Sequence, residues 1–152
     1  MADQKSQQAI TLRIQRTFPA PREQVFQAWT DPQELKKWWG PAGYTTPSAE
    51  IDLRVGGPYR IAMRSPEGVV YDLYGVYRVV EPPRKLVYTW NWRGTHMDDI
   101  GETLVTVEFR NLQQGAEIIL THEHFPNQKA YDEHDWGWNA TLDRLAPAKS
   151  AT

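Results

Sequence analysis

The 152-residue sequence contains no cysteine. This absence excludes disulfide bonds, thiolate nucleophiles and cysteine-ligated zinc, and it is compatible with a reducing compartment. No apolar run approaches the roughly 20 residues that a membrane-spanning helix requires, and the polar residues 1–8 contain no signal-peptide core. We therefore expect a cytoplasmic protein that does not insert into membranes.

Charge of one sign does not dominate either. The chain has 17 Lys and Arg against 19 Asp and Glu, which are scattered along it, and its formal net charge is −2. Without a basic block or an acidic tail, we expect no nucleic-acid partner. The length and the 40% hydrophobic content fit one globular domain, predicted over residues 9–146, with flexible tails at 1–8 and 147–152.

Tryptophan, by contrast, is abundant, with seven residues that, apart from Trp29, occur in close pairs. Each indole buries a large apolar body but carries an N–H group that requires an acceptor. A domain of this size must stack such rings into one core or use some of them to line a cavity. Which of the two applies is the central question for function.

The N-terminal part predicts one strand and two short helices. Residues 10–18 alternate between apolar and polar, as in a half-buried strand. The first helix begins at Pro21. The second has Asp31 as its N-cap, Pro32 at its first position and Glu34 three residues after the cap, and it ends at Gly40.

Residues 47–123 follow a strand–turn–strand pattern that predicts an antiparallel meander. Within residues 69–80 the inward face is ambiguous, because both alternating sets are apolar, and a bulge could change the direction of Tyr77. Residues 127–145 change to a helical period and predict a long amphipathic C-terminal helix. The predicted fold is α+β, with a curved antiparallel sheet wrapped round this helix and two short helices after the first strand. The space between sheet and helix is a natural ligand cavity.

Several segments carry a family resemblance: residues 17–20, 25–32, 38–41, 52–57, 75–77, 81–90, 120–123, 137–138 and 142–145. Together they are similar to the activator of heat-shock-protein-90 ATPase homologue family, of the START-like (SRPBCC, polyketide-cyclase-like) superfamily. The resemblance implies the helix-grip fold over nearly the whole chain. The segments match the C-terminal domain of the activator alone, and not its N-terminal chaperone-binding domain. A chaperone-interacting, cochaperone-like domain is one of the alternative functions that the resemblance implies.

We predict that the cavity is lined by aromatic and apolar residues together with one histidine. Trp38 and Trp39 are adjacent, so one ring is expected in the core and the other at the cavity mouth or the surface. A completely filled core is the competing interpretation. The predicted lining residues are Trp38, Trp39, Tyr59, Met63, Tyr77, Tyr88, Trp90, Trp92, His122, Trp138 and Leu142.

Two histidines, His122 and His124, are expected on one strand face because residues two apart project alike. With His134 they could ligate a metal, but the set is sparse for zinc, and we expect no metal and no cofactor. A buried, hydrogen-bonded histidine is the favoured interpretation. As a polar group in the cavity, His122 could orient a ligand or act as a general base.

Two further features suggest surface roles. The acidic loop 94–102 is long for a hairpin connection, which suggests a lid. Trp136 lies opposite Trp138 on the helical wheel, so it should be exposed or covered by another segment or partner.

The favoured function is binding of a hydrophobic or aromatic small molecule in the cavity. The first alternative is a polyketide-cyclase-like or hydrolase-like enzyme that uses His122. The second is the chaperone-interacting domain, with Trp136 and the acidic loop as contacts. The sequence assigns no oligomeric state.

Overall fold

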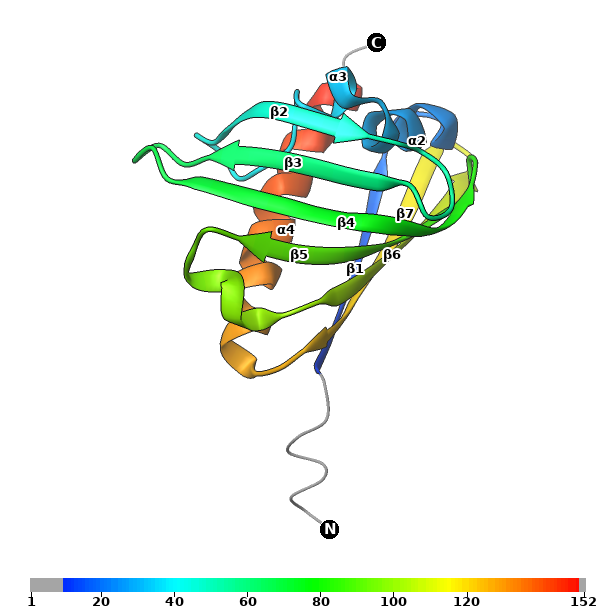
Figure 1. Ribbon diagram of the computed structural model, residues 1–152. Coiled ribbons are helices and arrows are strands. Elements are labelled where there is room, and N and C mark those ends of the chain that lie inside the picture. Colours follow the sequence, from blue (N-terminus) through cyan, green and yellow to red (C-terminus); the bar gives the residue numbers. More distant parts are fainter. Residues whose placement is uncertain (1–9, 151–152) are drawn as a thin grey trace.

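The structure is a computed structural model that describes residues 10–150 and, of these, the side chains of residues 10–145. Its elements follow the chain in the order shown in Figure 1: β1 (Ile10–Phe18), α2 (Arg22–Thr30), α3 (Pro32–Leu35), β2 (Thr45–Ile51), β3 (Pro58–Arg64), β4 (Val70–Glu81), β5 (Lys85–Arg93), the 3-10 helix η1 (His96–Ile100), β6 (Thr103–Leu112), β7 (Gly115–Phe125) and α4 (Gln128–Ser150).

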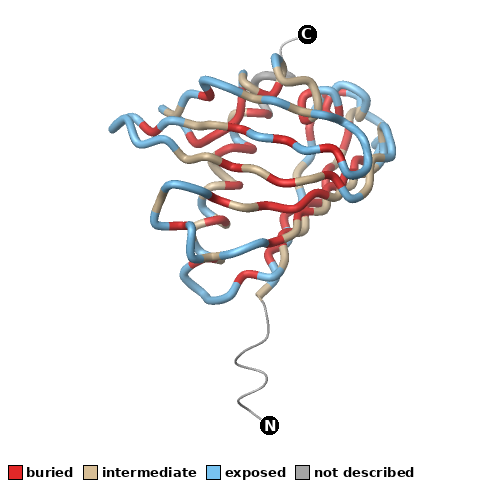
Figure 2. The backbone as a smooth tube through the Cα atoms, viewed as in Figure 1, coloured by how far each residue is buried: buried red, intermediate tan, exposed pale blue. Residues whose placement is uncertain are grey.

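The strands form one seven-stranded antiparallel sheet in the order β1-β7-β6-β5-β4-β3-β2. The strands from β2 to β7 are a meander, because each pairs with its neighbour in sequence, and β1 is added beside β7. The sheet curves round α4, while α2 and α3 lie at one end of it (Figure 1). Buried positions alternate with more exposed ones along most strands (Figure 2). The predicted α+β helix-grip fold is confirmed.

The second short helix is shorter than predicted. Asp31 caps α3 by accepting a hydrogen bond from the backbone N–H of Gln33 at 2.9 Å, and Pro32 occupies the first helical position as expected. The helix ends at Leu35, and the backbone N–H groups of Trp38 and Trp39 both donate to its carbonyl oxygen. Because the two tryptophans follow on turns instead of a helix, both rings point inward, with 0% and 4% of their surface exposed.

The inward face of β4 is the one that contains Leu73 and Tyr77, both buried. The register between β4 and β5 shifts immediately after Tyr77, so the Tyr77 side chain still points inward. Beyond the shift the alternation changes by one residue, and Val80 packs against the core. Gly75 lies between Leu73 and Tyr77 in β4 and pairs with Tyr59 of β3. The hydroxyl of Tyr59 donates to the carbonyl oxygen of Thr89 in β5. A β-carbon at Gly75 would lie 2.1 Å from that same oxygen, so the close approach of the strands requires glycine.

The prediction that His122 and His124 share a strand face is wrong. Between the β1–β7 pairs Ile10–Phe125 and Leu12–His122, β7 has one more residue than β1, which is a β-bulge. His124 lies in the bulge with φ of 80°. It is therefore exposed, whereas His122 and Phe125 are completely buried.

The C-terminal helix is longer than predicted. It continues to Ser150, so residues 147–150 of the expected C-terminal tail are helical. The expected tails at residues 1–8 and 151–152 lie outside the described residues. None of the helices in the described part of the chain is long and apolar enough to cross a membrane.

Candidate functional site

A pocket of about 190 Å³ opens between α4, the inner face of the sheet, η1 and the loop that follows α3. Its walls are mostly aromatic, with two methionines and a few polar side chains. The lining residues are Trp39, Pro41, Tyr44, Met63, Tyr71, Trp90, Trp92, His96, Met97, Glu133, His134, Trp136, Gly137, Trp138 and Thr141.

The structure divides the predicted lining residues into two groups. Those that line the pocket are Trp39, Met63, Trp90, Trp92 and Trp138. The others do not line it, against the prediction, and are buried in the core: Trp38, Tyr59, Tyr77, Tyr88, His122 and Leu142. The space between sheet and helix is therefore a core at one end and a pocket at the other.

Aromatic packing explains why the closed end has no room. The rings of Tyr59, Tyr77 and Tyr88 contact one another with centroids 5.4 to 5.9 Å apart. The hydroxyl of Tyr88 accepts the indole N–H of Trp29 at 3.1 Å. Burial raises the pKa of all three tyrosines, so their hydroxyls stay neutral. Trp38 is fixed there too, because its indole N–H donates to the carbonyl oxygen of Ala28 at 3.0 Å.

Sequence reasoning missed several lining residues, although some carried a signal. His134 and Thr141 lie four residues before and three after Trp138, which is the spacing that places residues on one helix face. Tyr71 belongs to the alternating set that contains Tyr77. Pro41 and Tyr44 follow a turn whose path has no periodic signal in the sequence.

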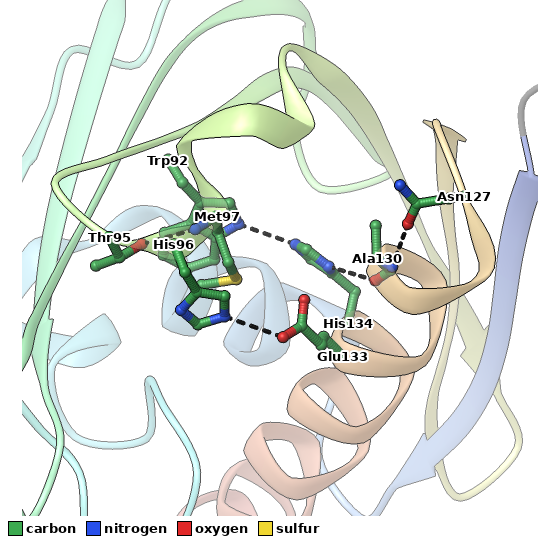
Figure 3. A network of polar contacts seen from close by, with 8 residues as sticks. All are labelled: Trp92, Thr95, His96, Met97, Asn127, Ala130, Glu133 and His134. Atoms are coloured by element: carbon green, nitrogen blue, oxygen red, sulfur yellow. Dashed lines mark hydrogen bonds and ion pairs between the residues drawn. The ribbon is translucent and has the colours of Figure 1, made fainter.

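His134 anchors the inner wall through a hydrogen-bond network (Figure 3). Its Nε2 atom accepts the indole N–H of Trp92 at 2.9 Å and that of Trp90 at 3.3 Å. Its Nδ1 atom then carries the proton and donates to the carbonyl oxygen of Ala130 at 2.8 Å. Burial lowers the pKa of His134, against the opposing effects of the Ala130 carbonyl and Glu133. The imidazole is therefore a neutral acceptor at neutral pH.

His122 has the same role one layer deeper. Its Nδ1 atom accepts the indole N–H of Trp138 at 3.0 Å, and its Nε2 atom lies 2.7 Å from the hydroxyl of Thr103. That hydroxyl donates to the carbonyl oxygen of Trp90 at 3.3 Å. Burial, reinforced by His134 and His124, lowers the pKa of His122 well below its ordinary value.

This geometry does not give His122 the position of a general base. A base must lie within hydrogen-bond reach of the proton that it removes. His122 is completely buried, does not line the pocket, and uses its free lone pair to accept from Trp138. In the described part of the chain, no group of three or more His, Asp or Glu side chains is arranged to hold a metal ion.

The loop between β5 and β6 covers one side of the pocket. Thr95 caps η1 by accepting from the backbone N–H of Met97, and Asp98 accepts from the backbone N–H of Thr95. The Met97 side chain is buried against the pocket. η1 also contacts α4, because His96 Nε2 lies 3.0 Å from Glu133 Oε2 (Figure 3). The position fits a lid, and movement of the loop remains a prediction.

Arg144 fixes the opposite wall. Its Nη1 atom lies 2.9 to 3.3 Å from four backbone carbonyl oxygens, those of Trp39, Gly40, Pro41 and Tyr44. The loop is irregular, so its carbonyl groups have no hydrogen-bond partners in a β-ladder. The guanidinium supplies such a partner and holds the loop in place. Arg144 thus ties the loop after α3 to α4, and these two elements form facing walls of the pocket.

Trp136 lies at the mouth of the pocket. Its side chain is 61% exposed, as the helical wheel predicted. It borders the pocket on one side and, on the other, a groove with Asp132, Asp135 and Asp143.

Comparisons with solved structures agree with this architecture. A protein of Chromobacterium violaceum is 28% identical, with a TM-score of 0.83, over 94% of this chain and 99% of that one. The AHSA1 protein of Silicibacter pomeroyi is 30% identical, with a TM-score of 0.80, over 91% of this chain and 96% of that one. A comparison with the curated proteins finds no match.

The family comparison covers most of the chain. The model of the family described as "Activator of Hsp90 ATPase homolog 1-like protein" matches residues 19–148, from the end of β1 into the last turns of α4. The match thus includes the elements that form the pocket. The chain therefore belongs to the Activator of Hsp90 ATPase homolog 1-like family, with the START-like helix-grip fold predicted from its sequence.

Proposed function

We propose that the protein binds a small hydrophobic or aromatic molecule in the pocket between the sheet and α4. The observation that carries this proposal is an aromatic pocket of about 190 Å³ whose wall is fixed before any ligand arrives. The indole N–H groups of Trp90, Trp92 and Trp138 are bound by the two buried histidines. Their rings are thus held in place, which lowers the entropic cost of binding.

The size of the pocket restricts the ligand. A cavity of about 150 Å³ holds benzene, whereas pockets for drug-sized molecules span about 300–1,000 Å³. A volume of about 190 Å³ therefore suits a compound of one or two rings. Larger polycyclic ligands would require η1 to move away from α4.

Binding accounts for the site better than catalysis by His122. Both ring nitrogens of His122 and of His134 already have protein partners, so neither imidazole has a free lone pair for a pocket-bound substrate. An enzyme that depends on His122 would have to break the Trp138 contact first. We therefore place the cyclase-like and hydrolase-like alternatives behind binding.

The test is calorimetric titration with one- and two-ring compounds such as indole, naphthol and benzyl alcohol. Gly137 lies on the pocket wall in α4, and a β-carbon there would have no atom within 4 Å. Gly137→Leu should therefore fill the pocket and abolish binding while the helix is retained. Ala140→Leu is the matched control, because Ala140 lines the outer groove and not the pocket.

The expected result is micromolar to millimolar binding by the wild type and Ala140→Leu, with none by Gly137→Leu. Thermal unfolding of both variants checks that they are folded. Absence of heat from the whole panel, together with unchanged indole N–H resonances of Trp90, Trp92 and Trp138, would contradict the proposal.

A second candidate function is contact with a chaperone, as the name of the family implies. It is favoured by Trp136, which is exposed next to an acidic groove on α4. Large exposed aromatic side chains are typical of interface hot spots. The test is the ATPase rate of the host's Hsp90 homologue with added wild-type protein or Trp136→Ala. An effect of the wild type that Trp136→Ala lacks supports this function, and no effect of either protein contradicts it.

A further inference from the structure

The charge of the pocket lining is one-sided. Glu133 is the only carboxylate among the described residues that line the pocket, and the lining contains neither Lys nor Arg. The remaining polar groups are imidazoles and hydroxyls. We infer that the ligand is an arylalkylamine whose ring occupies the pocket and whose ammonium group lies at the mouth beside Glu133. This inference rests on the proposed function and specifies its ligand class.

The walls favour a cation over an anion. The tryptophans at positions 90, 92 and 138 direct their N–H groups toward His134 and His122, so they offer a ligand ring faces and carbon edges. Aromatic faces attract ammonium groups through the ring quadrupole. A carboxylate that entered the same space would lose its hydration without gaining a cationic partner.

Glu133 has the geometry to bind an ammonium group without losing its present partner. Its Oε2 atom contacts His96 Nε2 at 3.0 Å, and its side chain is 32% exposed. A carboxylate has about four acceptor positions on two oxygens, so a second donor can bind beside His96. In Figure 3 the Glu133 side chain extends from α4 toward η1, where it meets His96.

Two of the elements that border the pocket, η1 and α4, extend this negative charge. Five carboxylates and one lysine lie on η1 and on residues 128–136 of α4: Asp98, Asp99, Asp132, Glu133 and Asp135, with Lys129. Such an excess raises the local concentration of cations and speeds their association. The field at the mouth and the chemistry of the walls thus select the same class of ligand.

The test compares three probes of nearly equal shape: 2-phenylethylamine, the neutral 2-phenylethanol and the anionic 3-phenylpropanoate. Calorimetry at pH 8 keeps the amine protonated and the propanoate ionised. We expect the amine to bind about tenfold more tightly than the alcohol, and the carboxylate to bind most weakly. Added salt should weaken binding of the amine and leave the alcohol unchanged.

Two variants locate the contact. Glu133→Gln should weaken amine binding about fivefold. It should weaken alcohol binding by less than twofold, because the Gln side-chain oxygen can still accept a hydrogen bond from His96. Asp132→Asn is the matched control, because it removes one charge from the same helix at a residue that does not line the pocket. It should reduce amine binding by less than twofold, and thermal unfolding should show both variants folded.

The outcomes separate the two proposals. If the alcohol or the carboxylate binds as tightly as the amine, this inference is wrong and the pocket is still a binding site. If Glu133→Gln and Asp132→Asn have equal effects on the amine, the contact with Glu133 is wrong. If none of the three probes binds and the one- and two-ring panel also fails, the proposed function itself is wrong.

Discussion

The indole N–H of Trp138, a residue of the pocket wall, donates at 3.0 Å to Nδ1 of His122, which is completely buried. Trp90 and Trp92 donate to His134 in the same way. A tryptophan-rich core must supply acceptors for its N–H groups, and neutral imidazoles supply them without introducing a charge. The two histidines are thus structural counterparts of the tryptophans, and they explain how rings from β5 and α4 meet at a pocket wall.

His122→Ala should lower the free energy of unfolding by about 3 kcal/mol. The substitution leaves the N–H of Trp138 and the hydroxyl of Thr103 without their partner and opens a void. Urea denaturation measures the loss. His124→Asn is the control on the same strand, because His124 is exposed and Asn tolerates its positive φ. Equal losses in the two variants would show that the buried network does not contribute in this way.

Stability should fall as the pH decreases below about 6.5. Burial lowers the pKa of both His122 and His134 in the folded protein. Below the ordinary value of about 6.5 the unfolded chain takes up protons that the folded chain does not, so unfolding becomes more favourable by up to about 1.4 kcal/mol per pH unit for each histidine. The stabilisation is complete above pH 6.5 and is lost toward the folded pKa values.

Unfolding free energies between pH 5 and pH 7.5 test this dependence. His122→Gln removes one of the two groups and should reduce the slope by about half. His124→Asn should retain the wild-type slope. A slope that is unaffected by His122→Gln would mean that other groups cause the acid sensitivity.

The fold was predictable because its signals are local. Alternation in β5, the cap at Asp31 and the helical period after Asn127 each follow from neighbouring residues. The errors lie where tertiary contacts override local pattern. The bulge at His124 breaks an alternation that the sequence shows as regular, and the turns after Leu35 replace a helix that Lys36 and Lys37 would have continued.

The site was harder to predict than the fold, because lining a pocket depends on depth as well as direction. Tyr88 and Trp90 lie on one face of β5, yet only Trp90 reaches the pocket, since tyrosines from β3 and β4 fill the space beside Tyr88. No periodicity distinguishes these two positions. Glu133 was missed for a related reason, because it lies at the edge of the apolar stripe of α4 and has the character of a solvated residue.

Arg144→Met should destabilise the protein by about 2 kcal/mol and weaken ligand binding. It removes the donor shared by the carbonyl groups of Trp39, Gly40, Pro41 and Tyr44, so the wall loses its link to α4. Arg144→Lys keeps the charge and should recover part of the loss. Arg84→Met is the control, because the Arg84 side chain is 63% exposed and pairs with Glu81 at the surface, where the expected cost is below about 1 kcal/mol. A loss as small for Arg144→Met as for Arg84→Met would exclude an anchoring role.

Thr95→Ala should loosen η1 and open the pocket more often. Loss of an N-cap costs about 1 kcal/mol, and here the cost falls on a short helix whose contacts with the body include buried Met97, partly buried Ile100 and the contact between His96 and Glu133. Opening of η1 is local, so hydrogen exchange of the Asp98 amide, whose acceptor is the backbone carbonyl of Thr95 that the variant retains, should become about fivefold faster, whereas amides in the centre of β6 stay unchanged. Ligand dissociation should accelerate by a similar factor, because the lid and the pocket share Met97. Thr11→Ala, at an exposed position on β1, should change neither rate. Faster exchange without faster dissociation would mean that the ligand leaves by a path that η1 does not control.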